Sequence, residues 1–476
     1  MPNEARWSEL FAGRNAARAT MLASAVVLHA INVFLATTIL PSIVADIGGL
    51  DYYAWNTTLF VVASIIGAAC SARLLQSAGP RGAYLVAALL FLAGAAACAL
   101  AGSMPVMLAG RTVQGLGGGL LVALSYAMIR LIFPENLWPR AIALVSGMWG
   151  IGTLFGPAVG GIFAELGMWR VAYGSLVPVA ALFAVAALAL LPARSHDTDE
   201  RSALPIPQLL FLSASVLAVS AGSVSEGLLA TTLGIAAAVA LFGLLILAEA
   251  RSANRLFPKG AFNLATPLGR AYATVALFAM SVTCSDIFIP LFLQVLHAQS
   301  PLFAGYIAAV MSAGWTAGSI FSSSLRDGGI TTVGRVAPWL CIGSLAALAL
   351  LMPAACDGAW PQVLQISIAV TGVGLAVGLV WPHLLTRVFQ VAPQGEQDLA
   401  AASVMTVQMY ATAMGASLAG MIANTAGLTN PGGVEGTANA AFWLFATLIV
   451  GPVLCLFLMG KVLKAPTAAM RSGAAE

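Results

Sequence analysis

Long apolar stretches dominate this chain, and each can cross a lipid bilayer as a helix. About 20 apolar residues span the hydrocarbon of a membrane. Charged residues make up 8% of the sequence, whereas soluble domains contain roughly 25%. We therefore predict an all-α membrane protein with fourteen transmembrane spans, over residues 19–41, 54–75, 82–102, 105–132, 139–163, 169–192, 205–223, 228–250, 268–296, 300–324, 335–354, 360–386, 399–425 and 438–461.

The basic residues are distributed unevenly between the two sides of these spans. Of the 21 Lys and Arg residues, all except Arg111 and Arg170 fall in the tails, in connections on the same side as the tails, or in the span ends next to those connections. Positive charge collects on the cytoplasmic side of membrane proteins. The pattern predicts a multi-pass protein of a bacterial inner (plasma) membrane, with both termini in the cytoplasm.

A weak internal repeat divides the chain into two halves. Glycines cluster in the fourth span and again in the twelfth, at Gly115, Gly117, Gly118 and Gly119 and at Gly372, Gly374 and Gly378. Repeated halves around a midplane site are typical of secondary transporters. We predict a cytoplasmic tail (1–18), an N-terminal six-helix bundle (19–192), a linker with two inserted transmembrane helices (193–267), a C-terminal six-helix bundle (268–463) and a second cytoplasmic tail (464–476).

Two charged residues inside the predicted spans are candidates for function, because burying charge in hydrocarbon is costly. Arg111 stays protonated, and the nearby Gln114 and Gly115 favour a packed, inward-facing site over a side chain that extends to the membrane surface. Asp286 is the only acid well inside a span. A low dielectric favours the neutral form of a carboxyl group, as a proton carrier requires. The alternative role for Asp286 is a structural hydrogen bond.

Several uncharged polar and aromatic residues could complete a transport pathway. His29 and Asn32 are three residues apart and share a helix face; the imidazole is either a proton relay or an interhelical hydrogen-bonding group. Aromatic rings with polar tips suit a cavity for amphipathic molecules, although packing is an alternative for each of them. The aromatic candidates are Tyr126, Trp149, Trp315, Trp381 and Tyr410, and Gln408 is a further polar candidate. His383 and Arg387 belong at the cytoplasmic interface.

The stretch 147–161 carries six glycines and a proline inside the fifth predicted span: Gly147, Gly150, Gly152, Gly156, Gly160, Gly161 and Pro157. Such residues weaken helices in water, but in a bilayer small residues let two helix backbones approach closely. We predict a bent helix packed tightly on a partner, and a contact surface between the two halves.

The sequence contains no motif for ATP-driven transport, enzymatic catalysis or metal binding. There is no P-loop, Ser-His-Asp arrangement or nucleotide fingerprint, and the glycine-rich stretches do not follow strands. The six cysteines have no metal-ligand or CxxC spacing; they are Cys70, Cys98, Cys284, Cys341, Cys356 and Cys455. We predict no enzyme activity, no catalytic residues, no cofactor, no metal and no nucleic-acid partner.

Three local motifs resemble those of the major facilitator superfamily, most closely its 14-helix drug:proton antiporter family. Residues 152–161 resemble the antiporter motif of the fifth helix, and Arg111 to Gly115 resemble the fourth-helix motif R-x-x-Q-G. Residues 40–43, Leu-Pro-Ser-Ile, resemble the end of the first helix. The resemblance implies two six-helix bundles with pseudo-symmetry, an inserted helix pair and secondary active transport.

The chain departs from the family pattern at two positions. Asn32 stands where the first-helix motif usually carries an acid, and Gln76 replaces the acid of the loop motif after the second helix. Gly79 and Arg81 remain from that degenerate loop motif. Without the first-helix acid, the proton site has to lie elsewhere, and we assign it to Asp286.

These observations predict proton-coupled export of amphipathic small molecules or drugs by alternating access, with the monomer as the transport unit. The expected partners are a small-molecule substrate, protons and the lipid bilayer. An uncoupled facilitator or a narrow-specificity metabolite carrier is the alternative, and a non-transporting membrane receptor is a third.

Overall fold

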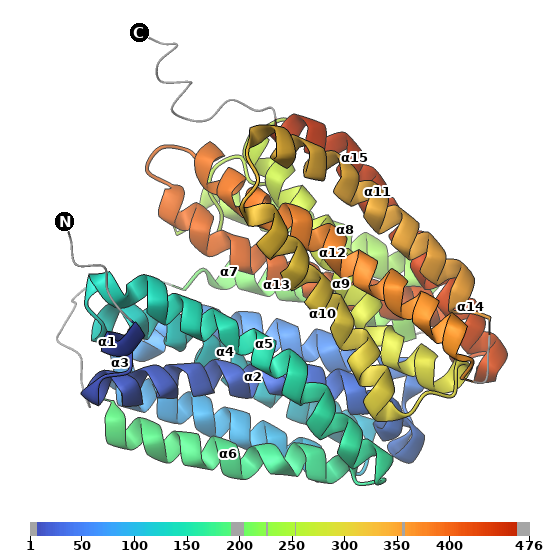
Figure 1. Ribbon diagram of the computed structural model, residues 1–476, viewed down its shortest axis with the longest axis horizontal. Helices are drawn as coiled ribbons and strands as arrows, with labels where there is room; N and C mark the ends of the chain where they lie inside the picture. Colours follow the sequence, from blue (N-terminus) through green and yellow to red (C-terminus); the bar gives the residue numbers. More distant parts are fainter. Residues whose placement is uncertain (1–6, 192–203, 225–226, 253, 355–357, 464–476) are drawn as a thin grey trace. The chain divides into compact units, whose positions relative to one another are not determined.

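The computed structural model describes residues 7–191, 204–224, 227–252, 254–354 and 358–463. Over these residues the chain forms α-helices and short 3-10 helices joined by connections, and it contains no strand (Figure 1). Residues 1–6 of the first predicted tail, the whole of the second (464–476), residue 192 at the end of the predicted N-terminal bundle, residues 193–203 of the predicted linker and Cys356 lie outside the described residues.

The chain folds into two compact units, and the first comprises residues 1–49 and 59–204. Its helices are α1 (Trp7–Leu10), α2 (Gly13–Ile47), most of α3 (Trp55–Ala99), α4 (Met104–Ile132), η2 (Glu135–Leu137), α5 (Trp138–Glu165) and α6 (Trp169–Leu190). Helix α2 packs on α4, α5 and α6.

Helix α3 is two helices joined end to end. Gly79 interrupts it with φ of 68° and ψ of 173°, a backbone conformation that residues with a side chain rarely adopt. Pro80 follows and has no backbone N–H to continue the helix. The break falls between the second and third predicted spans, so the predicted connection is present although it contains no extended loop.

The second unit comprises residues 50–58 and 205–476. Its elements are η1 (Leu50–Tyr52), the first turn of α3, α7 (Ile206–Val224), α8 (Leu228–Arg251), α9 (Pro267–Leu296), α10 (Pro301–Ser323), α11 (Asp327–Leu351), α12 (Trp360–Val391), α13 (Gln397–Thr425), α14 (Gly433–Leu448) and α15 (Val450–Leu463).

The fourteen predicted spans correspond to these helices, with two spans in α3 and the last span divided between α14 and α15. By length and composition, 11 segments of the described chain could cross a membrane. That set counts α3 once and omits α10 and α13. The predicted all-α membrane architecture is confirmed.

The inserted helices α7 and α8 belong to the same compact unit as the C-terminal bundle. Ser215 and Ser220 of α7 form hydrogen bonds to the Tyr410 hydroxyl (3.0 Å) and the Ser417 hydroxyl (2.7 Å) of α13. The polar positions of α7 therefore attach the inserted pair to α13.

Close packing at glycine recurs in both units, as the predicted repeat requires. In the first unit, Gly115 and Gly119 of α4 lie against the backbone of α3 at Phe60 and Ser64. In the second unit, Gly374 and Gly378 of α12 lie against the backbone of α10, at Met311 and Trp315. A methyl group at any of these glycines would overlap the facing carbonyl, so small residues allow the helices to approach closely.

Candidate functional site

A buried polar centre forms around Arg111 in the first unit. The Arg111 side chain is 2% exposed, and its Nη1 donates to Gln114 Oε1 at 2.7 Å and to Asn32 Oδ1 at 3.4 Å. The guanidinium carbon lies 4.0 Å from the centre of the Phe60 ring, in cation–π geometry. These contacts describe a packed, inward-facing arginine, not a side chain that extends to the membrane surface.

The three polar residues of this centre come from two helices. Arg111 and Gln114 are one turn apart on α4, so their side chains share a face, and Asn32 reaches them from α2. The amide oxygens of Asn32 and Gln114 face the arginine and are uncharged. The Nδ2 of Asn32 and the Nε2 of Gln114 are buried and have no hydrogen-bond partner among the described residues.

His29 extends the polar centre one turn along α2. Its ring is 3% exposed and lies 5.3 Å from the Phe60 ring and 5.7 Å from the Trp149 ring. It packs on Gly118 of α4, where a methyl group would lie 2.5 Å from His29 Nδ1. That nitrogen has no hydrogen-bond partner in the described part of the chain. We call His29, Asn32, Arg111, Gln114, Phe60 and Trp149 the Arg111 centre.

Three residues of the Arg111 centre have buried nitrogens without a hydrogen-bond partner among the described residues. Buried polar groups without partners are rare because each costs roughly 1–3 kcal/mol. Here the unpartnered atoms belong to His29, Asn32 and Gln114, and all three surround one arginine. Such a cluster can bind a polar group or water, while the Phe60 and Trp149 rings offer apolar surface beside it.

Tyr126 is separate from this centre. Its hydroxyl lies 3.1 Å from the Ser146 hydroxyl of α5, so it links α4 to α5.

Asp286 lies in α9 of the second unit. Its carboxylate forms no hydrogen bond or ion pair within the described part of the chain, and it lies close enough to Tyr53 to interact electrostatically. Tyr53 is 1% exposed, and its hydroxyl has no partner in the described part of the chain. Its ring packs on Phe288, with ring centres 5.1 Å apart. A partly buried acid thus lies near a buried phenol whose hydroxyl has no partner among the described residues.

The other predicted residues of the second unit lie in separate places. Trp315 of α10 and Trp381 of α12 meet edge to face, with ring centres 4.8 Å apart. Tyr410 is held by Ser215, as described above. Gln408 lies half-buried on α13. His383 contacts the Ser322 carbonyl at 3.1 Å, and Arg387 donates to the Val462 carbonyl at 3.0 Å, so both link helix ends.

The glycine-rich helix α5 packs tightly, but against α2 of its own unit. Gly152, Gly156 and Gly160 are spaced four residues apart and meet α2 at Ala30, Phe34 and Leu35. This packing confirms the close approach to a partner helix, and the predicted contact surface between the two halves stays a prediction. Gly147 and Gly150 have open space around them, while Pro157 and Gly161 are buried.

The residues that remain from the degenerate loop motif lie in the first unit, and Arg81 makes its contacts there. Arg81 donates through Nε and Nη2 to the Leu191 carbonyl, at 3.2 and 3.0 Å, which ties α3 to the end of α6. Gly79 supplies the break in α3, and Gln76 is exposed.

Sequence reasoning missed Phe60, Tyr53 and an ion-pair cluster at the other end of the first unit. Arg170 forms a 2.6 Å ion pair with Asp46, which also accepts from Trp169 Nε1 at 3.1 Å. The Trp169–Arg170 pair was visible in the sequence, but its partner was not. Phe60 and Tyr53 have aromatic and apolar neighbours in the sequence, so nothing in the sequence distinguishes either of them.

Comparison with known proteins agrees with this architecture. The Major Facilitator Superfamily profile matches residues 22–416. A probable multidrug-efflux transporter of Mycobacterium tuberculosis is 35% identical over 461 residues, which cover 95% of this chain and 96% of that protein. The tetracenomycin C resistance and export protein of Streptomyces glaucescens is 27% identical over 306 residues, 62% of this chain and 56% of that protein.

A solved structure shows the same fold. The crystal structure of a D-xylose–proton symporter aligns with a TM-score of 0.65 at 15% identity, over 94% of this chain and 97% of the symporter. The profile match and the near full-length relative establish the resemblance that the motifs predicted. This chain belongs to the major facilitator superfamily and is a membrane transporter, not an enzyme.

Proposed function

We propose that this transporter exports amphipathic small molecules in exchange for protons, by alternating access of its two halves to the two sides of the membrane. Two relatives, named for multidrug efflux and for tetracenomycin C export, support export as the direction. The monomer is the transport unit, and both termini lie in the cytoplasm of a bacterial cell.

The observation that carries the proposal is the Arg111 centre. Its guanidinium and unpartnered amide and imidazole nitrogens can hold a polar group, and the rings of Phe60 and Trp149 can contact an apolar body. A site with both kinds of surface recognises an amphipathic molecule without demanding one shape. Pockets with a few polar groups among apolar and aromatic walls are typical of small-molecule sites.

Asp286 supplies the proton step in this proposal. A proton from the outer side binds the Asp286 carboxylate in the outward-facing state. The neutral acid releases that proton to the cytoplasm in the inward-facing state, before the next substrate molecule is carried outward. Tyr53 lies beside the carboxylate and can donate a hydrogen bond to its charged form. Asn32 cannot take this role, because an amide does not exchange a proton near neutral pH.

The test is efflux from vesicles with an imposed pH gradient. We expect Asp286→Asn to lower proton-driven efflux at least about tenfold, because the amide cannot carry the proton, with unchanged membrane expression. Asp398→Asn, an exposed acid in the first turn of α13, is the matched control and should transport normally. Unchanged efflux by Asp286→Asn would remove this residue from the proton pathway.

An uncoupled or narrow-specificity carrier is the second candidate, and Asn32 favours it because the acid of the family motif is absent there. This candidate predicts that an uncoupler leaves substrate accumulation unchanged in cells that express the transporter. The proton-coupled exporter predicts that accumulation rises when the gradient collapses.

A further inference from the structure

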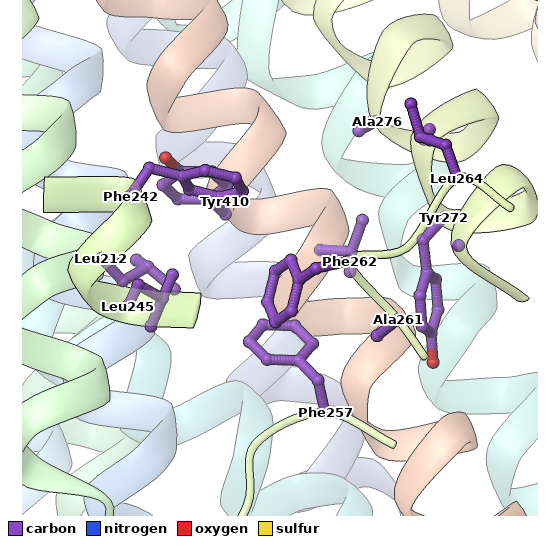
Figure 2. A pocket seen from close by; sticks show the side chains of 13 residues that line it. Leu212, Phe242, Leu245, Phe257, Ala261, Phe262, Leu264, Tyr272, Ala276 and Tyr410 are labelled. Atoms are coloured by element: carbon purple, nitrogen blue, oxygen red, sulfur yellow. The ribbon is translucent and has the colours of Figure 1, made fainter. Parts of the chain in front are cut away.

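A cavity of about 290 Å³ lies in the second unit, beside the inserted helix α8. Its walls come from α7, α8, α9, α13 and the connection between α8 and α9 (Figure 2). We call it the aromatic pocket; its ring-bearing residues are Phe242, Phe257, Phe262, Tyr272 and Tyr410. It is distinct from the Arg111 centre, which lies in the first unit.

Four of the five rings of this pocket form a connected cluster. Phe242 of α8 is stacked with Tyr410 of α13, with ring centres 5.9 Å apart and planes at 11°. Phe262 meets Phe242 edge to face at 5.7 Å and meets Phe257 at 5.0 Å. Figure 2 shows Phe257 and Phe262 projecting from the connection, between Tyr410 on one side and Tyr272 on the other. Faces and edges of several rings therefore border one space.

The polar tips of the two tyrosines are engaged by the protein. The Tyr272 hydroxyl lies 2.6 Å from the Ser403 hydroxyl and also donates to the Ala400 carbonyl at 3.2 Å. The Tyr410 hydroxyl is bonded to Ser215. Since these hydroxyls already have partners, the pocket offers an occupant apolar and aromatic contact and demands no hydrogen bond in return.

The connection that carries Phe257 and Phe262 is held in place by hydrogen bonds. Phe257 N donates to the Glu249 carboxylate, and Lys259 N donates to the Glu396 carboxylate, both at 2.7 Å. The Thr266 hydroxyl donates to the Gly260 carbonyl at 2.7 Å. Gly260 has φ of 84°, a conformation suited to glycine. The two rings are thus positioned before any ligand arrives, which lowers the entropic cost of binding.

A second cavity of about 360 Å³ adjoins the aromatic pocket and shares Phe257, Ala261 and Phe262 with it. Glu249, Arg255 and Lys259 line this neighbour, so it presents charges of both signs. Arg255 also lies 3.8 Å from Glu396. An apolar pocket beside a charged one matches a molecule with an apolar ring system and a polar end.

The outer surface of α8 is apolar. Leu229, Leu233 and Val239 are 72%, 60% and 67% exposed, and in a transmembrane helix such residues face lipid. A molecule dissolved in the bilayer can therefore approach the inserted pair without crossing water. The basic residues of the adjoining connection predict that it lies on the cytoplasmic side.

We propose that the aromatic pocket is an access site that binds the planar aromatic body of an amphipathic molecule taken from the inner leaflet, with its polar end in the adjoining charged cavity. This inference rests on the proposed export function for its substrate class. It assigns the inserted helix pair a role in substrate capture that is separate from the polar recognition at the Arg111 centre.

The test uses rhodamine 6G, a planar aromatic amphiphile, and full-length transporter in phosphatidylcholine nanodiscs without any ion gradient. Fluorescence anisotropy, corrected with empty nanodiscs, measures the dissociation constant of the dye. We expect Phe262→Ala and Phe242→Ala each to weaken binding roughly 2- to 10-fold, which corresponds to one lost aromatic contact. Phe262→Leu keeps an apolar side chain without a ring and should weaken binding less than Phe262→Ala.

The control is Phe321→Ala, which removes an exposed aromatic ring of α10 outside the pocket and should leave binding unchanged. Equal affinity of Phe262→Ala, Phe242→Ala and the unaltered protein would overturn the access site. The access site would also be overturned if native mass spectrometry found a tightly held phospholipid that the dye does not displace and that Phe262→Ala loses. The pocket would then be a lipid site. Dye binding needs no ion gradient. If the dye binds in a way that depends on Phe262 but proton-driven efflux is not observed, only the export proposal is rejected.

Discussion

At the scale of single residues, Arg111 shows why a buried charge can be a functional group as well as a cost. Its guanidinium contacts two amide oxygens and an aromatic face at once. Both hydrogen bonds come from Nη1, and the planar guanidinium also lies over the Phe60 ring, a stacking contact that the compact ammonium of lysine does not reproduce. We therefore propose that the identity of the cation, and not only its charge, matters at this position.

We expect Arg111→Lys to lower the initial rate of efflux at least about tenfold, because one charge-assisted hydrogen bond contributes roughly 1.5–3 kcal/mol and the Phe60 contact is lost as well. Arg326→Lys, at an exposed position before α11, is the matched control. Rates are compared at equal amounts of protein in proteoliposomes. An Arg111→Lys variant with the rate of the unaltered protein would mean that position 111 requires only positive charge.

At the scale of elements, α5 shows what a glycine pattern predicts and what it leaves open. The four-residue spacing of Gly152, Gly156 and Gly160 predicts one smooth helix face and close packing. It does not name the partner, because any helix with a complementary face would fit. The structure identifies α2, and the bulk of Phe34 lies where a methyl group on Gly156 would have to be.

A matched pair of alanine substitutions tests this packing. Gly156→Ala should lower the thermal unfolding temperature in detergent, because its methyl group would lie 2.5 Å from Phe34 Cβ and overpacking costs typically 1–3 kcal/mol. Gly150→Ala lies on the same helix with no atom within 4 Å, so alanine there should be neutral or slightly stabilising. Equal unfolding temperatures for the two variants would contradict the α2–α5 contact.

The chemical contrast between a residue and its neighbours decides how much of the site the sequence predicts. Arg111, Asn32, Gln114 and His29 stand out because polar groups are rare in apolar spans, and the structure brings these four together. Phe60 completes their centre but resembles any other apolar residue of its helix. The aromatic pocket was missed for the same reason, since its rings come from distant parts of the chain and only the fold brings them together.

At the scale of the whole molecule, the short segment 50–58 is the one part of the N-terminal half that belongs to the second compact unit. The Trp55 indole donates to the Ser220 carbonyl at 3.1 Å, and the Asn424 amide donates to the Asp51 carbonyl at 3.0 Å. The Thr58 and Ser417 hydroxyls are 3.4 Å apart. From Leu59 onward α3 belongs to the first unit, so the helix changes unit within one turn.

Alternating access requires the two repeats to move against each other, and a helix that belongs to both units has to release one of them during the cycle. Segment 50–58 is attached by these three hydrogen bonds and by the packing of the buried Tyr53 ring on Phe288. We expect a disulfide in a Thr58→Cys/Ser417→Cys variant to stop efflux, because it would hold the segment on α13. Efflux is measured in proteoliposomes after oxidation and again after reduction, which should restore it. Each single cysteine variant, treated identically, controls for oxidation of the native cysteines. Full efflux by the oxidised, cross-linked protein would show that segment 50–58 stays on α13 throughout the cycle and that motion begins beyond Thr58.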